Sequence, residues 1–235
     1  MKLKGCFLKK RFWLLLITLG IGGTLYANNE LKLLTDSLRR VIDEKHIFVQ
    51  KKEDRINRIK CMLKSSGLTL EGKYRINLRL YDEYKKFHID SAIHYVEDNI
   101  EISRKLNKSY LTTQSSLHLS LLYSMCGRFR EAEIILKGID SSTLPKDLLI
   151  AYYETYSSFW GHYSISVANN IYGQQQAAYQ DSLIALIDHT SLSYKMSRAS
   201  YYIWRDTLRS KEIFKELLEI EEVGTPNYAM ITHSY

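Results

Sequence analysis

The sequence predicts an all-α fold, a solenoid of antiparallel helix hairpins preceded by an N-terminal signal helix. After residue 28, apolar residues recur at spacings of three and four, typical of one face of an α-helix, and no segment has a convincing strand pattern. This part of the chain holds seven Gly and two Pro, too few turn residues for an all-β sandwich or barrel. The order helix, short turn, helix recurs several times, which is typical of a repeat protein.

Residues 1–27 have the pattern of an export signal. Five basic side chains lie within residues 2–11, and an apolar run follows over residues 12–25 and ends before Tyr26-Ala27. The run is shorter than the ~20 residues that a spanning helix needs. We therefore expect a signal peptide cleaved after Ala27, or alternatively an uncleaved signal anchor. Either places the chain outside the cytoplasm, in the periplasm or at the inner membrane facing the periplasm.

The net charge gives no support to nucleic-acid binding. The whole chain has 33 Lys and Arg against 26 Asp and Glu, a formal net charge of +7. Without the five basic residues of the signal segment the two signs nearly balance. A nucleic-acid surface needs clustered basic charge, so we expect no direct nucleic-acid binding by this chain.

Residues 28–66 are expected to form an N-terminal helical segment, either one helix or two helices that are broken near His46. Gly67 follows as a left-handed helix C-cap. The apolar face of this segment consists of Leu31, Leu34, Leu38, Val41, Phe48, Ile56, Ile59 and Leu63.

Residues 67–235 are expected to form the repeats, incomplete at the C-terminus. Asp90 is the expected N-cap of the second of these helices, and residues 140–145 form a loop. The helices are predicted at residues 70–86, 90–106, 109–126, 129–138, 146–168, 170–188, 191–205 and 208–222, with a further helix from 227.

One unit defines the repeat most clearly. Small residues at 120 and 132 allow the two helices to approach closely, Gly127 makes the turn, and the larger side chains fill the seams. The pattern resembles a tetratricopeptide repeat (TPR) and consists of Leu119, Ser120, Tyr123, Gly127, Phe129, Ala132 and Leu136.

Two weaker copies flank this unit. The upstream copy is shifted by 40 residues and keeps Ile89, Ala92 and Val96 in the second helix. Segment 146–188 has two longer helices and no clean signature. The downstream copy places these residues in comparable roles: Tyr194, Ser197, Tyr201, Ser210 and Phe214.

A wider resemblance covers most of residues 35–235. After the exported N-terminus come, in order, KKEDRINRIK, LYDEYKKFHIDSAIHYVEDNIEIS, GRFREAEIIL, YYETYSSFW and TPNYAMITHSY. In that order they resemble the N-terminal periplasmic sensor half of a Bacteroidota TPR regulator family (domain of unknown function 6377). The resemblance implies a role in sensing a partner for a membrane-associated transcriptional regulator, whose further parts would be a transmembrane helix, a coiled coil and a cytoplasmic region. Because the chain stops at Tyr235, early in a new helix, we expect a truncated member or a stand-alone copy.

The sequence contains no pattern of catalytic or metal-binding residues. Gly67-x-x-x-x-Gly72-Lys73 resembles a phosphate-binding loop, but Tyr74 follows where Ser or Thr should bind magnesium, so an interhelix turn is favoured. Seven scattered His residues show no ligand spacing, and no nucleophile elbow is present. We expect no enzyme activity, no cofactor and no metal.

The cysteines and tyrosines allow structural interpretations. Cys61 and Cys126 each lie among apolar residues of a helix face, which favours two buried free thiols over a disulfide. Eighteen tyrosines are expected mainly in the seams between helices. The functional alternative for them is a tyrosine-lined concave groove.

The repeat register places four first-helix residues on the concave side: Gln114, Leu117, Leu121 and Met125. They are the candidate groove. The resulting hypothesis is a non-enzymatic extracytoplasmic binding or sensor module whose partner is a protein or peptide of the cell envelope. Membrane contact would run through the N-terminal apolar segment if it is uncleaved. The alternative is an exported helical component of the cell envelope that binds nutrients or glycans.

Overall fold

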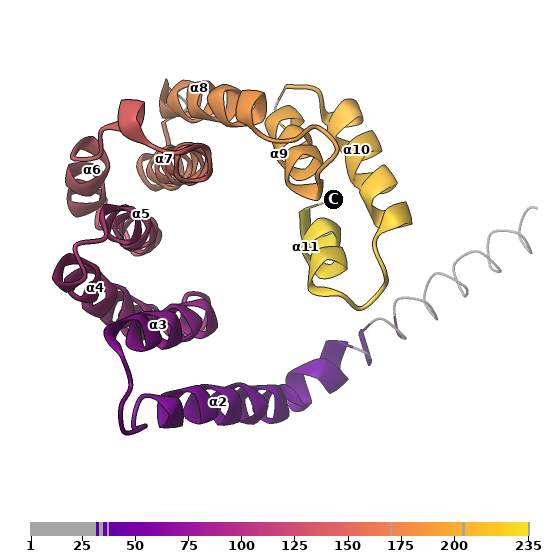
Figure 1. Cartoon of the computed structure of the whole chain (residues 1–235). Helices are drawn as coiled ribbons and strands as arrows, with labels where there is room; N and C mark the ends of the chain where they lie inside the picture. The colour runs from indigo at the N-terminus through magenta and orange to yellow at the C-terminus, as the bar shows by residue number, and fades with distance from the viewer. Residues whose placement is uncertain (1–31, 33–34, 37, 170, 204, 235) are drawn as a thin grey trace, which may run out of the picture. The chain divides into compact units, whose positions relative to one another are not determined.

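A computed structural model describes residues 32, 35–36, 38–169, 171–203 and 205–234. Within these ranges the chain consists of helices joined by turns, with no strand (Figure 1). The predicted all-α class is confirmed. The predicted signal segment, residues 1–27, lies outside the described residues.

The helices follow the predicted order, and most of their ends lie within about two residues of the predicted ones. A short 3-10 helix, Ser141–Thr143, lies in the loop expected at 140–145. The α-helices are α2 (Lys45–Met62), α3 (Leu70–Tyr84), α4 (Ile89–Lys105), α5 (Ser109–Met125), α6 (Phe129–Lys137), α7 (Lys146–Val167), α8 (Ile171–Leu186), α9 (Leu192–Tyr202), α10 (Thr207–Ile220) and α11 (Pro226–Ser234).

The chain divides into two units, Met1–Arg58 and Ile59–Tyr235, which we describe separately. In the first unit, residues 38–43 are helical and a turn at Glu44 precedes α2, so the break expected near His46 falls two residues earlier. Leu38 and Phe48 expose more than half of their surface. The domain boundary at residue 66 remains a prediction.

In the second unit each helix packs against its neighbour in sequence. Contacts join α3 to α4, α4 to α5, α5 to both α6 and α7, α7 to α8, and so on to α11. Figure 1 shows these helices side by side in chain order. Such nearest-neighbour packing is what a helical-repeat solenoid requires, and it confirms the TPR-like architecture.

In the central repeat, small residues allow helices α5 and α6 to approach each other closely. Ser120 and Ala132 are both fully buried, and Ser120 Oγ donates a hydrogen bond to the Ala132 carbonyl oxygen at 3.1 Å. Gly127 has φ +81° in the turn between α5 and α6, a conformation that favours glycine. Leu136 is fully buried, and Phe129 packs edge-on against aromatic rings of α7. The roles predicted for these residues match their positions.

The other two repeat residues are also buried, and one of them contacts the preceding helix α4. Leu119 and Tyr123 are buried, and the Tyr123 hydroxyl donates to the Glu97 carboxylate of α4 at 3.0 Å. In the upstream copy, Leu80 of α3 and Ala92 of α4 are both fully buried. The turn of this copy, between α3 and α4, spans residues 85–88, and Asn107, with φ +53°, lies in the connection from α4 to α5.

The downstream copy is shifted relative to the prediction. Ser210 Oγ donates to the Ala199 carbonyl oxygen at 2.9 Å, so Ala199, and not Ser197, makes the close contact between α9 and α10. The paired residues are 11 apart here and 12 apart in the central repeat. A fixed shift along the sequence therefore misses the contact.

Two local predictions were wrong. The N-cap of α4 is His88, whose Nδ1 accepts from the Ser91 backbone N–H at 3.4 Å, while Asp90 lies inside the first turn. An acidic side chain there is still favourable because it faces the positive end of the helix dipole. Cys61 and Cys126 are free but exposed, not buried, because each lies at the C-terminal end of its helix, where the apolar face runs out.

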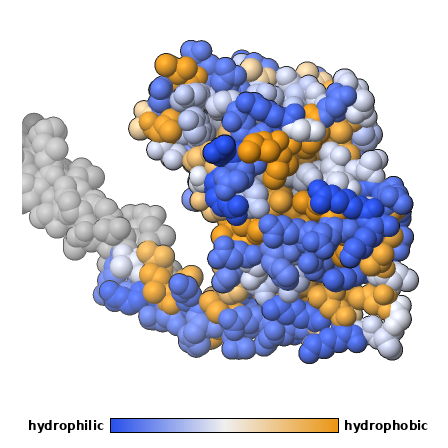
Figure 2. All heavy atoms as spheres, turned by 90° about the vertical axis from the view of Figure 1, so that its left-hand side faces the viewer, coloured by the Kyte–Doolittle hydropathy of each residue, from blue (hydrophilic) through white to orange (hydrophobic). Residues whose placement is uncertain are grey.

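The last three helices have a core of their own. It consists of Ala199, Phe214, Leu217 and Ile231, and no residue of α3–α8 belongs to it. Figure 2 shows one face of the chain, on which hydrophilic residues predominate and apolar patches lie between them.

Candidate functional site

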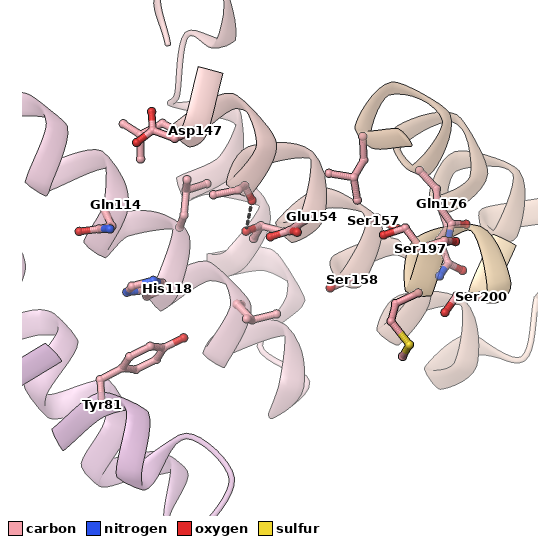
Figure 3. A pocket seen from close by; sticks show the side chains of 18 of the residues that line it. Tyr81, Gln114, His118, Asp147, Glu154, Ser157, Ser158, Gln176, Ser197 and Ser200 are labelled. Carbon is pink, nitrogen blue, oxygen red and sulfur yellow. Dashed lines mark hydrogen bonds between the residues drawn. The ribbon is translucent and has the colours of Figure 1, made fainter. Parts of the chain in front are cut away.

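The candidate site is a pocket of about 700 Å³ in the second unit. Residues of α5, α7, α8 and α9 form most of its lining, and Tyr81 of α3 closes one side (Figure 3). Among the described residues that line it there is no Lys or Arg. The wall mixes hydroxyls, amides and carboxylates with leucines, a composition suited to a ligand with both polar and apolar parts.

One wall carries a stacked pair of rings. Tyr81 and His118 lie with ring centroids 4.4 Å apart and planes 14° apart. Burial lowers the pKa of His118 to about 4, and Asp82 and Lys85 nearby have smaller, opposing effects. The imidazole is therefore neutral at pH 7. Burial also raises the pKa of Tyr81 to about 12, so its hydroxyl remains protonated.

Helix α7 supplies the two carboxylates of the pocket. Asp147 accepts a hydrogen bond from the Tyr110 hydroxyl, which lowers the pKa of this carboxyl group. Glu154 is open to solvent but surrounded by the pocket wall, and this partial desolvation raises its pKa. In Figure 3 it lies between the side carrying His118 and the side carrying Gln176. Glu154 has no hydrogen-bond or ion-pair partner in the described part of the chain.

Helices α8 and α9 form the opposite wall. Gln180 Nε2 donates to the Ser197 carbonyl oxygen at 3.2 Å and so ties the two helices together. Gln176 lies close against Gly161 of α7, where an added Cβ would meet the amide nitrogen at 3.0 Å. Because Gly161 has no side chain, the Gln176 amide can sit on the pocket wall.

Three of the four predicted groove residues line this pocket. Gln114, Leu117 and Leu121 all do, although Leu117 is almost fully buried. The Gln114 side-chain oxygen accepts a hydrogen bond from the Tyr74 hydroxyl at 3.1 Å. Met125 is exposed at the end of α5 and does not line the pocket. That these residues bind a partner remains a prediction.

The sequence reasoning missed the α7–α8 side of the pocket. Glu154 and Gln176 lie in segment 146–188, which has no clean repeat signature. Their helices still stack as a hairpin, through contacts such as the Tyr156–Tyr179 rings, whose centroids lie 4.4 Å apart. The sequence signal that could have located Glu154 and Gln176 is the set of polar residues that interrupts the apolar pattern of these helices.

The tyrosines have both of the roles considered from the sequence, which are packing between helices and lining a groove. Buried ones pack between helices: Tyr84 of α3 stacks on Tyr95 of α4, and Tyr156 of α7 stacks on Tyr179 of α8. Tyr81 and Tyr110 also line the pocket. The pocket is therefore partly, not mainly, lined by tyrosine.

Where the structure describes the chain, the contact between Ser124 and His162 does not have the arrangement of a catalytic triad. Ser124 Oγ lies 3.0 Å from His162 Nδ1 but donates its own hydrogen to the Leu121 carbonyl oxygen at 2.8 Å. His162 Nδ1 must then act as the donor and is not placed to accept the serine proton. Among the described residues, no three His, Cys, Asp or Glu side chains come together as a metal site.

The Gly67–Lys73 segment forms an interhelix turn, as favoured from the sequence. Gly67 has φ +78°, the left-handed conformation expected of it. Gly72 lies inside α3, where a Cβ would clash with the Leu68 side chain at 2.7 Å. Lys73 faces Asp98 at 3.5 Å.

A comparison with protein families decides the identity of this helical array. The model of the SusR N-terminal TPR domain matches residues 42–235, which include all of α2–α11. The chain belongs to the SusR N-terminal TPR domain family. The resemblance to a Bacteroidota TPR regulator family is thereby confirmed. No curated protein and no solved structure matches the chain.

The residues that match the SusR N-terminal TPR domain model include those of both walls of the pocket. TPR-type domains are, as a class, protein-interaction modules and not catalysts, which agrees with the site described above. In the described part of the chain, no helix combines the length and the apolar character needed to cross a membrane.

Proposed function

We propose that this chain is a non-enzymatic, extracytoplasmic sensor module of a membrane-associated transcriptional regulator. Its pocket would bind a protein or peptide partner of the cell envelope. Membership of the SusR N-terminal TPR domain family supports the regulatory role. The basic and apolar pattern of residues 1–27 supports the location.

The observation that carries the proposal is the pocket between α5, α7, α8 and α9. It is concave, combines leucines with unpaired polar groups, and is formed by the faces that a helical solenoid offers to extended partners. Its groups suit recognition of a partner: Tyr110 and Asp147 are hydrogen-bonded to each other, and Glu154 makes no hydrogen bond or ion pair in the described part of the chain.

A photo-crosslinking amino acid in place of Leu121 tests the proposal in cells of a Bacteroidota host. Leu121 lines the pocket, and Lys137, exposed on α6 outside the pocket lining, is the matched control position. We expect a discrete crosslinked partner from position 121 and not from position 137. Equal crosslinking at both positions, or none at 121, would contradict binding in the pocket.

Location is tested separately with a C-terminal tag on the full chain. We expect the tag to be digested by protease added to spheroplasts, as it is for a segment facing the periplasm. A tag that is protected until the inner membrane is broken would show that the chain faces the cytoplasm, and the extracytoplasmic part of the proposal would fail.

The alternative function is an exported nutrient- or glycan-binding component of the cell envelope. It is favoured by the hydroxyls and amides of the pocket together with the Tyr81–His118 stack, because sugars bind to such mixed surfaces. A panel of neutral hexasaccharides titrated against the full chain distinguishes the two functions. Binding that is lost when Gln176 is replaced by alanine would favour this alternative.

A further inference from the structure

We infer that the pocket selects an extended peptide segment carrying a basic side chain, Lys or Arg, with Glu154 as its ionic partner. The inference rests on the proposed function, in which the partner is a peptide or protein, and adds the chemistry by which that partner is chosen. Three features of the pocket support it: its charge, its unpaired hydrogen-bonding groups and its apolar surface.

The first feature is the charge of the wall. The described residues of the lining include two carboxylates, Asp147 and Glu154, and no Lys or Arg, and His118 is neutral at pH 7. Asp147 already accepts a hydrogen bond from Tyr110. Glu154 has no partner in the described part of the chain, although the surrounding wall partly desolvates it. A carboxylate held in a concave surface without a cation concentrates negative potential there, which disfavours phosphorylated or other anionic ligands.

The second feature is a set of unpaired polar groups next to this carboxylate. Ser157 is 8% exposed, lines the pocket one turn along α7 from Glu154, and makes no hydrogen bond in the described part of the chain. The Gln176 amide and the Ser200 hydroxyl, on the more exposed opposite wall, also line the pocket and make no hydrogen bond in the described part of the chain. These groups are available to a ligand, and one with closely spaced donors and acceptors could pair with all of them.

A peptide backbone has such closely spaced groups, since each residue offers one N–H and one C=O. A side-chain amide such as Gln176 can donate to one peptide group and accept from the next. A simple polyamine has no acceptors to offer the serines and the glutamine. A neutral sugar would leave Glu154 without a cation.

The third feature is the apolar surface on both sides of the carboxylate. Leu117 and Leu121 lie on α5, and Leu183 and Met196 lie on the α8–α9 side. They can contact the aliphatic stem of a Lys or Arg side chain or the residues next to it, because these stems bury well against apolar groups. The ligand is thus a peptide with one basic residue among small or apolar ones, and not a polybasic segment.

Acetylated hexapeptide amides test the inference on the full chain by isothermal titration calorimetry. The series has an alanine and serine background and a central arginine, citrulline, leucine or glutamate. Citrulline has nearly the shape of arginine without its charge. We expect the arginine peptide to bind about tenfold more tightly than the citrulline peptide, as one partly desolvated ion pair would give.

The variant Glu154→Gln keeps the size and hydrogen-bonding atoms of the side chain and removes its charge. We expect it to bind the arginine and citrulline peptides equally. Glu219→Gln, on the exposed side of α10, is the matched control and should keep the tenfold preference. A preference for arginine that survives in Glu154→Gln would overturn the assignment of Glu154.

Failure of the inference differs from failure of the proposed function. If Leu121 crosslinks a partner but none of the hexapeptides binds at 1 mM, or all bind alike, the binding module stands and the basic specificity is wrong. Selective binding of the glutamate peptide would show that the pocket attracts anions, and this also overturns the inference.

Discussion

The buried imidazole of His118 should make the fold sensitive to mild acid. Its pKa is lowered to about 4 from the ordinary value of 6.5, mainly by burial. In the unfolded chain the imidazole regains its ordinary pKa, so between pH 6.5 and pH 4 the unfolded state binds more protons than the folded state. By linkage, the stabilisation from the neutral ring is complete above pH 6.5 and is lost as the pH falls toward 4.

The size of this effect follows from the two pKa values. Each pKa unit corresponds to about 1.4 kcal/mol, so acidification from pH 7 to pH 4.5 should remove about 2.5 kcal/mol of unfolding free energy through this group. This figure is an upper value, because the ring lies at the pocket wall and is partly accessible. Asp82 and Lys85, which are paired with each other at 2.7 Å, are the nearby charges and partly cancel.

The variant His118→Phe isolates the effect. It retains an aromatic ring beside Tyr81 and removes the proton-binding site, so the contributions of all other groups cancel in the comparison. Urea unfolding followed by circular dichroism at pH 7 and pH 4.5 gives the difference, and a proton NMR titration of His118 gives its pKa directly. The reasoning is refuted if the two proteins lose stability in parallel, or if the imidazole titrates near 6.5.

Four further substitutions test the packing. Gly127→Ala should destabilise the chain by about 1–2 kcal/mol, because φ is +81° there. Gly173→Ala should instead stabilise it by about 0.5–1 kcal/mol, because Gly173 lies in helix α8 with nothing within 4 Å of an added Cβ. Urea unfolding measures both changes in unfolding free energy, and changes of the same sign would contradict the turn geometry. Ala132→Leu should cost about 1–3 kcal/mol or more by overpacking the fully buried contact with Ser120, and an unchanged melting temperature would show that α5 and α6 are not in close contact. Phe214→Ala should cost about 3–5 kcal/mol, since the ring is 1% exposed within its cluster, and differential scanning calorimetry would show no downward shift if that cluster were loosely packed.

The fold was predictable from the sequence because its determinants are local. Apolar spacing and turn residues such as Gly127 mark the helices and their ends without reference to distant parts of the chain. The predictions from sequence were wrong at positions where two side chains could fill the same structural role. His88 caps α4 in place of Asp90, and Ala199 takes the contact in place of Ser197, in a pair 11 residues apart where the central repeat has a pair 12 apart.

One wall of the candidate site could be predicted from the sequence, and the other could not. The α5 wall followed from the register of the one clear repeat, so Gln114 and Leu121 could be named. Glu154 and Gln176 could not, because they lie on helices whose pairing leaves no repeat signature in the sequence. Met125 was placed on the concave side, but α5 ends at this residue and its side chain lies outside the pocket lining.

The separate core of α9–α11 has a thermodynamic consequence. An array whose segments contact mainly their sequence neighbours unfolds in parts, and a segment with its own apolar cluster can open while the rest remains folded. Amide hydrogens of α9–α11 should therefore exchange as one group, at a rate distinct from that of α3–α8. The pocket has walls on both sides of the α8–α9 junction. A ligand that needs both walls binds only the closed array, so its binding free energy adds directly to the stability of that junction and slows the exchange of the last three helices.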